Sequence, residues 1–432
     1  MSGAFTRYGV PTLLAGVVAV GITGCGSRPP SACLTPAAAP EVLAATNASD
    51  PVVTTDATGS AVVAWSSVTG RPVGVRLRDR RLQWGPTRSI GDYRTRNPAV
   101  AIDGTGRPWI AYEGYDTSDH AAVFAASGPD FTPSVVSRGQ INAQRPQLAS
   151  AGDGTLIAAW LTFVNGTQGA VAVSVHTRHG WSPPATVAQA ATRVEHLRLA
   201  AAADGSAVLA WTGGHGHAWA TVRRPDGVWS TATIVSSPNR EAIEPAVVAA
   251  GDGRAWVAWN ESLADGSAAT VILRAFADGS WGSPTTLDAA SQGPLQMPRP
   301  GQASLGPGLA LAGDGALTAT WAIGTHATSR VRARTRSPHG VWAAPLTLSQ
   351  PGDQAGAPAV VIGPDGRPIV AWEEIDHNLL RARSRTLGSA TPCTDLSRSL
   401  TESSSIALAG GPHPIAAFID LRRASIDVQA PR

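Results

Sequence analysis

Carboxylates that follow a large aromatic residue are the side chains of this sequence best placed, by type and spacing, for acid–base chemistry. Glutamates occur one or two residues after Tyr112, Trp259 and Trp372, and a tyrosine lies close to the first of them. Two neighbouring carboxyl groups can act as general acid and nucleophile at a glycosidic bond, and a tyrosine can act as a nucleophile. The candidate catalytic residues are Glu113, Tyr115, Glu261, Glu373 and Glu374.

Arginines precede the first apolar strand of several repeats, and they indicate an anionic ligand. A planar guanidinium meets a carboxylate through two parallel hydrogen bonds, which a lysine ammonium cannot do. All 34 basic residues of the chain are arginine. The candidate ligand-binding residues are Arg96, Arg145, Arg193, Arg240 and Arg299.

An internal repeat of about 50 residues positions these side chains. Its clearest copy, Pro358 to Trp372, has an apolar strand, an Asp365-Gly366 turn and a second strand ending in a large aromatic. Asp-Gly between apolar strands predicts a hairpin turn in which both turn residues adopt positive φ. The aromatic recurs at Trp65, Tyr112, Trp160, Trp211, Trp259, Trp321, Trp372 and Phe418.

A second aromatic series indicates that each repeat contains two hairpins. Its members follow Gly-containing or charged turns at Trp84, Phe131, Trp181, Trp229, Trp281 and Trp342. Four short antiparallel strands repeated in this way are typical of an all-β fold, the β-propeller. We predict eight four-stranded blades, in which the segment Ala39–Leu43 supplies the missing fourth strand of the last blade; a seven-bladed ring is the alternative.

The connections within the repeat divide the propeller into two faces. The turns joining strands one and two, and strands three and four, are tight, whereas the other loops are longer and more varied. Function on repeat folds usually resides in the variable loops of one face. We call the face with the longer loops the upper face. Glu373 and Glu374, which lie just beyond the repeat pattern, are expected to be closest to any site.

The N-terminal residues have the pattern of an export signal. Arg7 precedes the apolar run Val10–Val20, and small residues lead to Cys25. This order is typical of a secretory signal peptide, and the run is too short to span a membrane stably. A cysteine after small residues resembles the lipobox of bacterial lipoproteins, which implies that Cys25 is lipidated. A plain secreted protein is the alternative.

These features predict the organisation of the whole chain. We expect residues 1–24 to be a lipoprotein signal peptide, 25–32 a lipidated tether and 33–432 the propeller domain. The protein would then be anchored by its lipid to the outer face of the bacterial cell membrane. Cys33 and Cys393 would form a disulfide, because disulfides persist outside the cytoplasm. Two unpaired thiols are the alternative.

The charge and motif content limits the classes of partner. A net charge of +3 over 432 residues is too weak to favour nucleic acid. The sequence contains no motif typical of a phosphate-binding cofactor or a metal site. We therefore expect no cofactor, no metal and no nucleic-acid partner, and a monomer that meets the membrane only through its lipid.

One hairpin carries a family resemblance. Asp226, Gly227 and Trp229 lie in the segment Arg224–Trp229, which resembles a shortened Asp box of the bacterial sialidase-like propellers. An Asp box is structural, so the resemblance implies the fold. Sialidases also carry three arginines, a tyrosine–glutamate pair and an acidic proton donor.

Two functions follow from these observations as hypotheses. The first is an extracytoplasmic module that binds or scaffolds a protein or glycan ligand on its upper face. The second is a sialidase-like glycoside hydrolase that acts on anionic glycans from the same face.

Overall fold

The computed structural model describes most of the chain from Cys33 onward. The described residues are 33–34, 39–44, 47–128, 130–140, 142–152, 154–163, 169–190, 193–214, 216–262, 269–290, 306–324, 329–350, 354–376, 379–390, 393–397 and 403–431.

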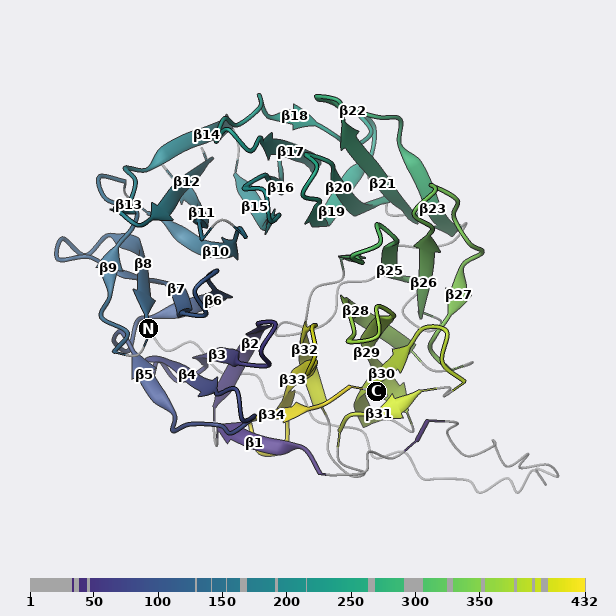
Figure 1. Ribbon diagram of the computed structural model, residues 1–432, viewed down its shortest axis with the longest axis horizontal. Helices are drawn as coiled ribbons and strands as arrows, with labels where there is room; N and C mark the ends of the chain where they lie inside the picture. Colours follow the sequence, from purple (N-terminus) through teal and green to yellow (C-terminus); the bar gives the residue numbers. More distant parts are fainter. Residues whose placement is uncertain are drawn as a thin grey trace, which may run out of the picture. The chain divides into compact units, whose positions relative to one another are not determined.

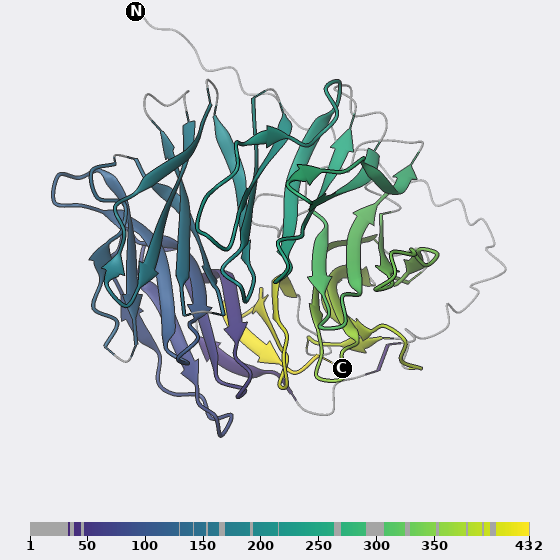
Figure 2. The same cartoon turned by 45° about the horizontal axis from the view of Figure 1, so that its top comes forward.

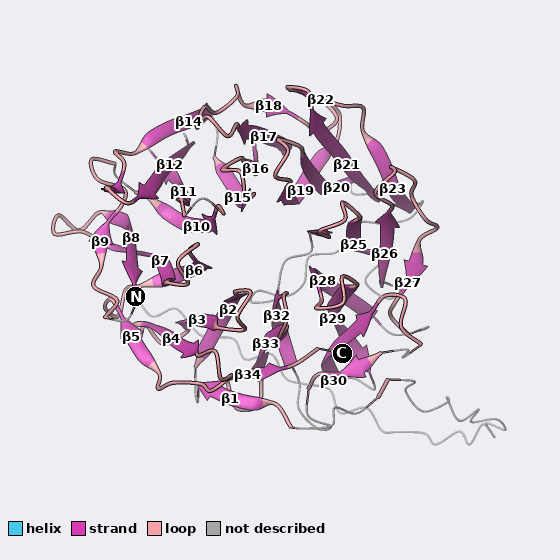
Figure 3. Ribbon diagram, in the orientation of Figure 1, coloured by secondary structure: helices cyan, strands magenta, loops and turns pink. Residues whose placement is uncertain are grey.

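Eight antiparallel sheets follow one another around a ring, so the described residues form an eight-bladed β-propeller (Figure 1). In seven blades the strands follow chain order from the centre of the ring outward, and in the eighth the outer strand comes from the N-terminal end of the chain. The described residues contain strands, turns and loops but no helix (Figure 3). The predicted all-β fold with eight four-stranded blades is confirmed.

The first strand of each blade lies nearest the centre of the ring (Figure 1). Each first strand contacts the first strand of the next blade, and the contact between β32 and β2 closes the ring. These strands are β2 (Ala48–Thr55), β6 (Arg96–Ile102), β10 (Gln144–Ser150), β15 (Val194–Ala201), β19 (Glu241–Ala249), β24 (Gly308–Leu311), β28 (Gln354–Ile362) and β32 (Ser403–Ala409).

The second and third strands form the middle of each blade. The second strands are β3 (Ala61–Ser67), β7 (Pro108–Tyr115), β11 (Leu156–Phe163), β16 (Ala207–Gly213), β20 (Ala255–Ser262), β25 (Leu317–Ile323), β29 (Pro368–Asp376) and β33 (Ile415–Asp420). The third strands are β4 (Val73–Arg78), β8 (Ala121–Ser127), β12 (Gly169–Thr177), β17 (His217–Arg223), β21 (Ala269–Ala277), β26 (Arg330–Arg336), β30 (Leu379–Thr386) and β34 (Ser425–Gln429).

The outer strands are short and lie at the rim of the ring (Figure 1). They are β5 (Arg88–Ile90), β9 (Ser134–Val135), β14 (Ala185–Ala190), β18 (Thr233–Ile234), β23 (Thr285–Ala290), β27 (Leu346–Thr347), β31 (Thr394–Asp395) and β1 (Glu41–Ala44). Two further short pieces, β13 (Gly180–Trp181) and β22 (Ser280–Trp281), also pair with the third strands of their blades.

The last blade is completed from the other end of the chain, as predicted. β1 pairs antiparallel with β34, and Glu41 lies opposite Val428. Cys33 forms a disulfide with Cys393, which confirms the predicted bond. Next to it, the backbone N–H of Leu34 donates to the Cys393 carbonyl oxygen at 2.8 Å. The bond therefore fastens the N-terminal segment to blade seven just before β1 completes blade eight.

The repeated aromatic of the second strand fills the space between neighbouring blades. Trp259 packs on Val208 and Val222 of the preceding blade, and Trp372 packs in the same way on Val331. Both indoles are at most 1% exposed, and replacing such a side chain by alanine typically costs about 3–5 kcal/mol. Because side chains alternate along a strand, the residue after each aromatic faces the following blade.

The hairpin turns differ in one detail from the expectation. In the clearest repeat, Gly366 has φ 78°, whereas Asp365 does not have a positive φ. The backbone N–H of Gly366 donates to the Gly363 carbonyl at 3.1 Å, and the Arg367 N–H donates to Asp365 Oδ1 at 3.0 Å. Only the glycine needs the left-handed conformation, because the aspartate side chain binds the turn backbone from an ordinary conformation.

Candidate functional site

The first strands bulge at one equivalent position near the upper face. In seven blades the pairing with the second strand shifts there, and the first bulge residue has a positive φ. These residues are Asp50, Asn97, Arg145, His196, Glu244, Ala357 and Ser405. Since the first strands lie nearest the centre of the ring, these equivalent positions surround the centre; Figure 2 shows the same ring of blades turned by 45°.

Three of these bulge positions carry long charged or titratable side chains. A left-handed residue in a bulge is usually glycine, and asparagine or aspartate is also tolerated. Arg145, His196 and Glu244 occupy the position in three consecutive blades, with φ between 42° and 52°. The left-handed conformation costs about 1–2 kcal/mol for such residues. A purely structural bulge would not need them, so these side chains mark a candidate site.

Glu113 connects blade two to this group. Its side chain is 1% exposed, and its Oε1 accepts hydrogen bonds from Arg96 Nε at 2.7 Å and Nη2 at 2.5 Å. Its Oε2 accepts from Asn97 Nδ2 at 2.8 Å and from the bulge N–H of Arg145 at 3.3 Å. The hydrogen bond to Glu113 is the main cause of the raised pKa of Arg96, to which Tyr115 also contributes. Glu113 therefore positions an arginine on each side of the blade junction.

His196 and Glu244 form the other half of the group. His196 Nε2 lies 3.8 Å from Glu244 Oε1, and its Nδ1 lies 2.9 Å from the Thr212 hydroxyl. Burial lowers the pKa of His196, and Glu244 acts against this effect. Glu244 Oε2 also accepts the backbone N–H of Gly306 at 2.8 Å. A ligand carboxylate arriving here would favour the protonated imidazole.

Arg145 is the most available cation of the group. Its side chain is exposed, and no ion pair or hydrogen bond joins its guanidinium to another residue in the described part of the chain. It lies close enough to His196 to lower the pKa of that imidazole. We call the following residues the rim cluster: Arg96, Asn97, Glu113, Arg145, His196 and Glu244.

The charges of the rim cluster leave an excess of one cation when Arg198 is counted with it. Arg198 is held beside Glu244, and burial lowers its pKa. Three arginines then face the two carboxylates of Glu113 and Glu244, with His196 neutral. Binding of one anionic group would balance this charge. The cluster is thus suited to a carboxylate-bearing ligand.

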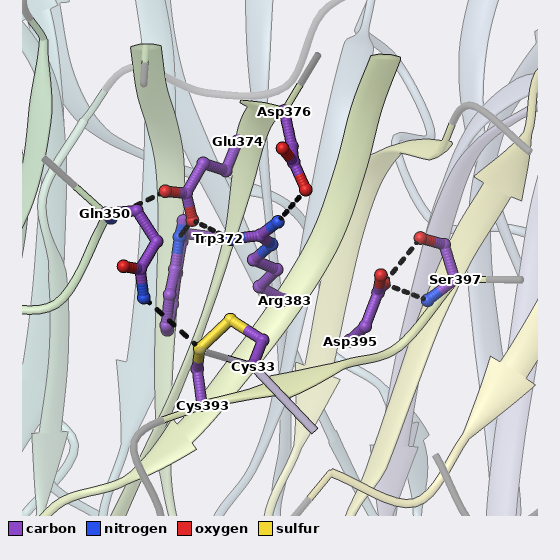
Figure 4. The surroundings of a disulfide bond; sticks show 9 residues. All are labelled: Cys33, Gln350, Trp372, Glu374, Asp376, Arg383, Cys393, Asp395 and Ser397. Carbon is purple, nitrogen blue, oxygen red and sulfur yellow. Dashed lines mark hydrogen bonds and ion pairs between the residues drawn. A yellow bond between two sulfur atoms is a disulfide. The ribbon is translucent and has the colours of Figure 1, made fainter. Parts of the chain in front are cut away.

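Two candidate glutamates serve the packing between blades. Glu261 Oε1 accepts the Trp259 indole N–H and the Ser237 backbone N–H, both at 2.8 Å. Glu374 repeats this arrangement with Trp372 at 2.8 Å and with the Gln350 N–H at 2.6 Å (Figure 4). Both side chains are at most 2% exposed. Their carboxylates are committed to neighbouring protein groups, which favours a structural role.

A buried arginine lies beside Glu374. Arg383 is 1% exposed, and its Nη1 and Nη2 lie 3.2 Å from Glu374 Oε2 and 2.6 Å from Asp376 Oδ2 (Figure 4). Removing one partner of such a buried pair is costly, because the remaining charge stays desolvated. This cluster lies among the core residues of blade seven and is not open to a ligand.

Glu373 faces blade eight and is also buried. Its Oε1 accepts the bulge N–H of Ser405 at 2.5 Å. Burial raises the pKa of Glu373 from 4.5 to about 7, although the hydrogen bond from Ser405 opposes the rise. At 5% exposure it does not present its carboxylate to solvent. Glu373 and Glu374 are therefore inside the blade packing, whereas the sequence pattern favoured them for the site.

The remaining candidates are distributed over the upper face. Tyr115 lies at the end of β7 near Arg96. Arg193 pairs with Glu195 at 2.9 Å, and Arg240 donates to the Thr270 hydroxyl at 3.4 Å. Neither contact joins them to the rim cluster. Two further predicted residues, Arg299 and Cys25, lie outside the described residues.

Sequence reasoning assigned no catalytic or ligand-binding role to three members of the rim cluster. Asn97, His196 and Glu244 each stand immediately before the first apolar residue of a repeat, where proline or leucine follows. A charged residue at this position of several repeats was the available signal. It went unused because a sequence does not show that the position is a left-handed bulge.

A hollow of about 360 Å³ lies at the opposite end of the first strands. It is lined by β2, β6 and β10 residues and the following turns, including Thr55, Asp103 and Ser150. Asp103 is already engaged by Thr105 and Trp109. In the described part of the chain, no three His, Cys, Asp or Glu residues lie together in a way that could hold a metal ion. No apolar helix of membrane-spanning length occurs there either.

Comparisons with known proteins find similarity only among solved structures. No protein-family model and no curated protein matches the sequence. Similar structures include a Hadza microbial sialidase (14% identity, 64% of this chain and 63% of that chain, TM-score 0.40). A PL25 ulvan lyase has 10% identity over 83% of this chain and 97% of that chain, with a TM-score of 0.48. A leech intramolecular trans-sialidase has 11% identity over 82% of this chain and 71% of that chain, with a TM-score of 0.45.

These neighbours include sialidases and other glycan enzymes built on β-propellers. The chain covers somewhat less than two thirds of the Hadza sialidase. At identities of 10–14% the similarities do not indicate an activity for this chain.

Proposed function

We propose that the propeller is a binding module that takes an anionic saccharide at the rim cluster. The observation that supports this most is the exposed guanidinium of Arg145, projecting from a strained bulge where glycine or asparagine would cost less. Arg96 and the protonatable His196 lie beside it, so the ligand group would meet several donors. A carboxylate fits the single excess positive charge of the cluster.

A binding assay with matched variants tests this proposal. The full chain would be titrated by calorimetry with glucuronic acid, N-acetylneuraminic acid and neutral glucose. We expect at least one acidic sugar to bind and glucose not to bind. Arg145→Gln should lower the affinity about tenfold or more, since a charged hydrogen bond is lost. Arg193→Gln is the control, because that arginine lies on the same face but is paired with Glu195.

Two outcomes would contradict the proposal. Equal binding of glucose and the acidic sugars would show that charge plays no part. An unchanged affinity in Arg145→Gln would place the ligand elsewhere. The remaining hypothesis would then be a module that binds a protein partner.

A sialidase-like hydrolase is the second candidate, supported by the contact between Tyr115 and Arg96 beside Glu113. The resemblance to sialidases implies a tyrosine–glutamate pair of this kind. Both carboxylate oxygens of Glu113 already accept hydrogen bonds from neighbouring side chains, which weighs against Glu113 acting as a catalytic acid. Hydrolysis of fluorogenic sialosides, lost in Tyr115→Phe, would favour the enzyme.

The location of the protein remains part of the proposal. The pattern of residues 1–25 supports export and lipid anchoring at Cys25 on the outer face of the bacterial cell membrane. An anchored propeller would hold its rim cluster close to surface glycans.

A further inference from the structure

Tyr93 stands apart from the other aromatic residues of the propeller. It is 67% exposed, whereas every other tryptophan, tyrosine and phenylalanine among the described residues is buried or half-buried. It lies in the connection from β5 to β6, on the upper face and three residues before Arg96. An exposed tyrosine ring offers an apolar face and a polar edge, which suits the C–H face and hydroxyls of a sugar.

The turn that carries Tyr93 is held firmly. The backbone N–H of Arg94 donates to Asp92 Oδ1 at 2.8 Å, and the Thr95 hydroxyl donates to the Asp92 carbonyl at 2.7 Å. The same hydroxyl accepts the Val73 N–H at 3.1 Å. A ring on an ordered turn loses little conformational freedom when a ligand stacks on it.

Arg94 supports the ring from one side. Its guanidinium carbon lies 5.7 Å from the centre of the Tyr93 ring and 4.4 Å from that of Tyr115. An ion pair with Asp119, and a longer one of 3.8 Å with Asp92, hold the guanidinium in place. Tyr93, Arg94 and Tyr115 thus form one stack, which we call the tyrosine stack.

The tyrosine stack is continuous with the rim cluster. Tyr115 lies close enough to Arg96 to help raise the pKa of that guanidinium. Arg96 in turn binds Glu113, which holds the Arg145 backbone. A saccharide with its acidic group at the rim cluster therefore has a path outward across blade two toward Tyr93.

The charges around the tyrosine stack are predominantly negative. Asp92, Asp116 and Asp119 surround it, and Arg94 is the arginine that pairs with two of them. Asp116 lies 3.9 Å from His120 Nδ1. A second carboxylate on the ligand would be repelled here, whereas the hydroxyls of a neutral sugar would find acceptors.

We infer that the tyrosine stack is a second subsite, which takes a neutral sugar next to the acidic unit bound at the rim cluster. This inference rests on the proposed function and defines its ligand more closely. The preferred ligand is an oligosaccharide in which uronic acids alternate with neutral sugars. A chain made of uronic acids alone fits less well.

Affinities for three probes test the inference on the full chain. The probes are glucuronic acid, a hyaluronan tetrasaccharide and tetragalacturonic acid. We expect the tetrasaccharide of alternating units to bind about tenfold more tightly than the monosaccharide, through stacking on one aromatic ring. Tyr93→Ala should remove this gain and leave the monosaccharide affinity unchanged. Tyr93→Trp should keep the higher affinity for the hyaluronan tetrasaccharide. Tetragalacturonic acid should gain less affinity over the monosaccharide than the hyaluronan tetrasaccharide does.

The outcomes separate the inference from the proposed function. Val341→Ala, which alters another exposed apolar residue, is the control and should change nothing. Tetrasaccharide binding unaffected by Tyr93→Ala would overturn the inference alone. Equal gains for the two tetrasaccharides would overturn the preference for a neutral sugar. Absence of binding of every acidic probe to the unaltered chain would overturn both.

Discussion

Glu113 and Glu373 occupy the same position in blades two and seven, but only Glu113 lies opposite an arginine. Glu113 pairs across the sheet with Arg96, whereas the residue opposite Glu373 is Gly356. Each carboxylate accepts the bulge N–H of the following blade. The same contact between blades is therefore made in two ways. In blade two Glu113 makes it as a carboxylate with a cationic partner, and in blade seven Glu373 makes it as a buried carboxyl group of raised pKa.

The buried carboxyl of Glu373 should make the stability of the protein depend on pH. Its pKa is raised to about 7 in the folded chain and is 4.5 in an ordinary environment. Between these values the folded state binds the proton more tightly, so stability falls as the pH rises. The whole loss is about 3 kcal/mol and is complete above pH 7. Glu373→Gln should remove it, as measured by urea unfolding at pH 5 and pH 8.

The comparison with Glu113 provides the control. Glu113→Gln should destabilise the chain at pH 8, because Arg96 loses its ionised partner. If Glu373→Gln lowers stability at pH 8 as much as Glu113→Gln does, the buried carboxyl group is not the cause of the pH dependence.

Replacing Arg145 by glycine should separate stability from binding. The residue has φ 52°, which glycine adopts without strain. We expect Arg145→Gly to leave the free energy of unfolding unchanged or to raise it by about 1 kcal/mol. The affinity for acidic sugars should fall at the same time. A variant that unfolds more easily would show that the arginine stabilises the bulge.

Glu374 and Glu261 should differ in their importance for folding. Both bind a tryptophan indole, but Glu374 also neutralises the buried Arg383. Glu374→Gln should cost about 3–5 kcal/mol, since it removes one partner of a buried ion pair. Glu261→Gln should cost about 1–3 kcal/mol, the range for a disturbed buried hydrogen bond. Equal losses in urea unfolding would argue against the role of Arg383.

The disulfide should contribute strongly to the closed ring. Cys33 and Cys393 are 360 residues apart in the chain, and the bond holds the segment that leads into β1. Serine at both positions should lower the free energy of unfolding by about 2–4 kcal/mol. A reducing agent should have this effect on the unaltered protein and none on the double variant. No effect of reduction on either protein would contradict the prediction.

Lipid anchoring predicts a change of location. Cys25→Ala removes the thiol that the lipobox pattern assigns to the lipid, so the protein should move from the membrane fraction to the medium. The alteration Cys33→Ser is the control and should leave the protein with the membrane. Retention of Cys25→Ala in the membrane fraction would contradict the anchor.

Much of the fold was predictable because its determinants are local and repeated. Alternating apolar residues, glycine turns and an aromatic every blade indicate the strands one by one. Tryptophans such as Trp160 and Trp321 recur because every blade needs the same filling on one side. The closing strand β1 was predictable because the last repeat lacks its outer strand.

The sequence by itself determined the architecture, favoured eight blades and a bond between Cys33 and Cys393, and selected Arg96 and Arg145 among the candidate ligand residues. The tertiary structure decided for eight blades against seven and for the disulfide against two free thiols. Only the tertiary structure decided which carboxylates are engaged in packing, because side chains of adjacent residues point to different blades. Glu374 turns back to its own tryptophan, Glu373 faces the next blade, and Glu113 organises two arginines. The rim cluster likewise depends on bulges that bring residues of consecutive blades together around one axis.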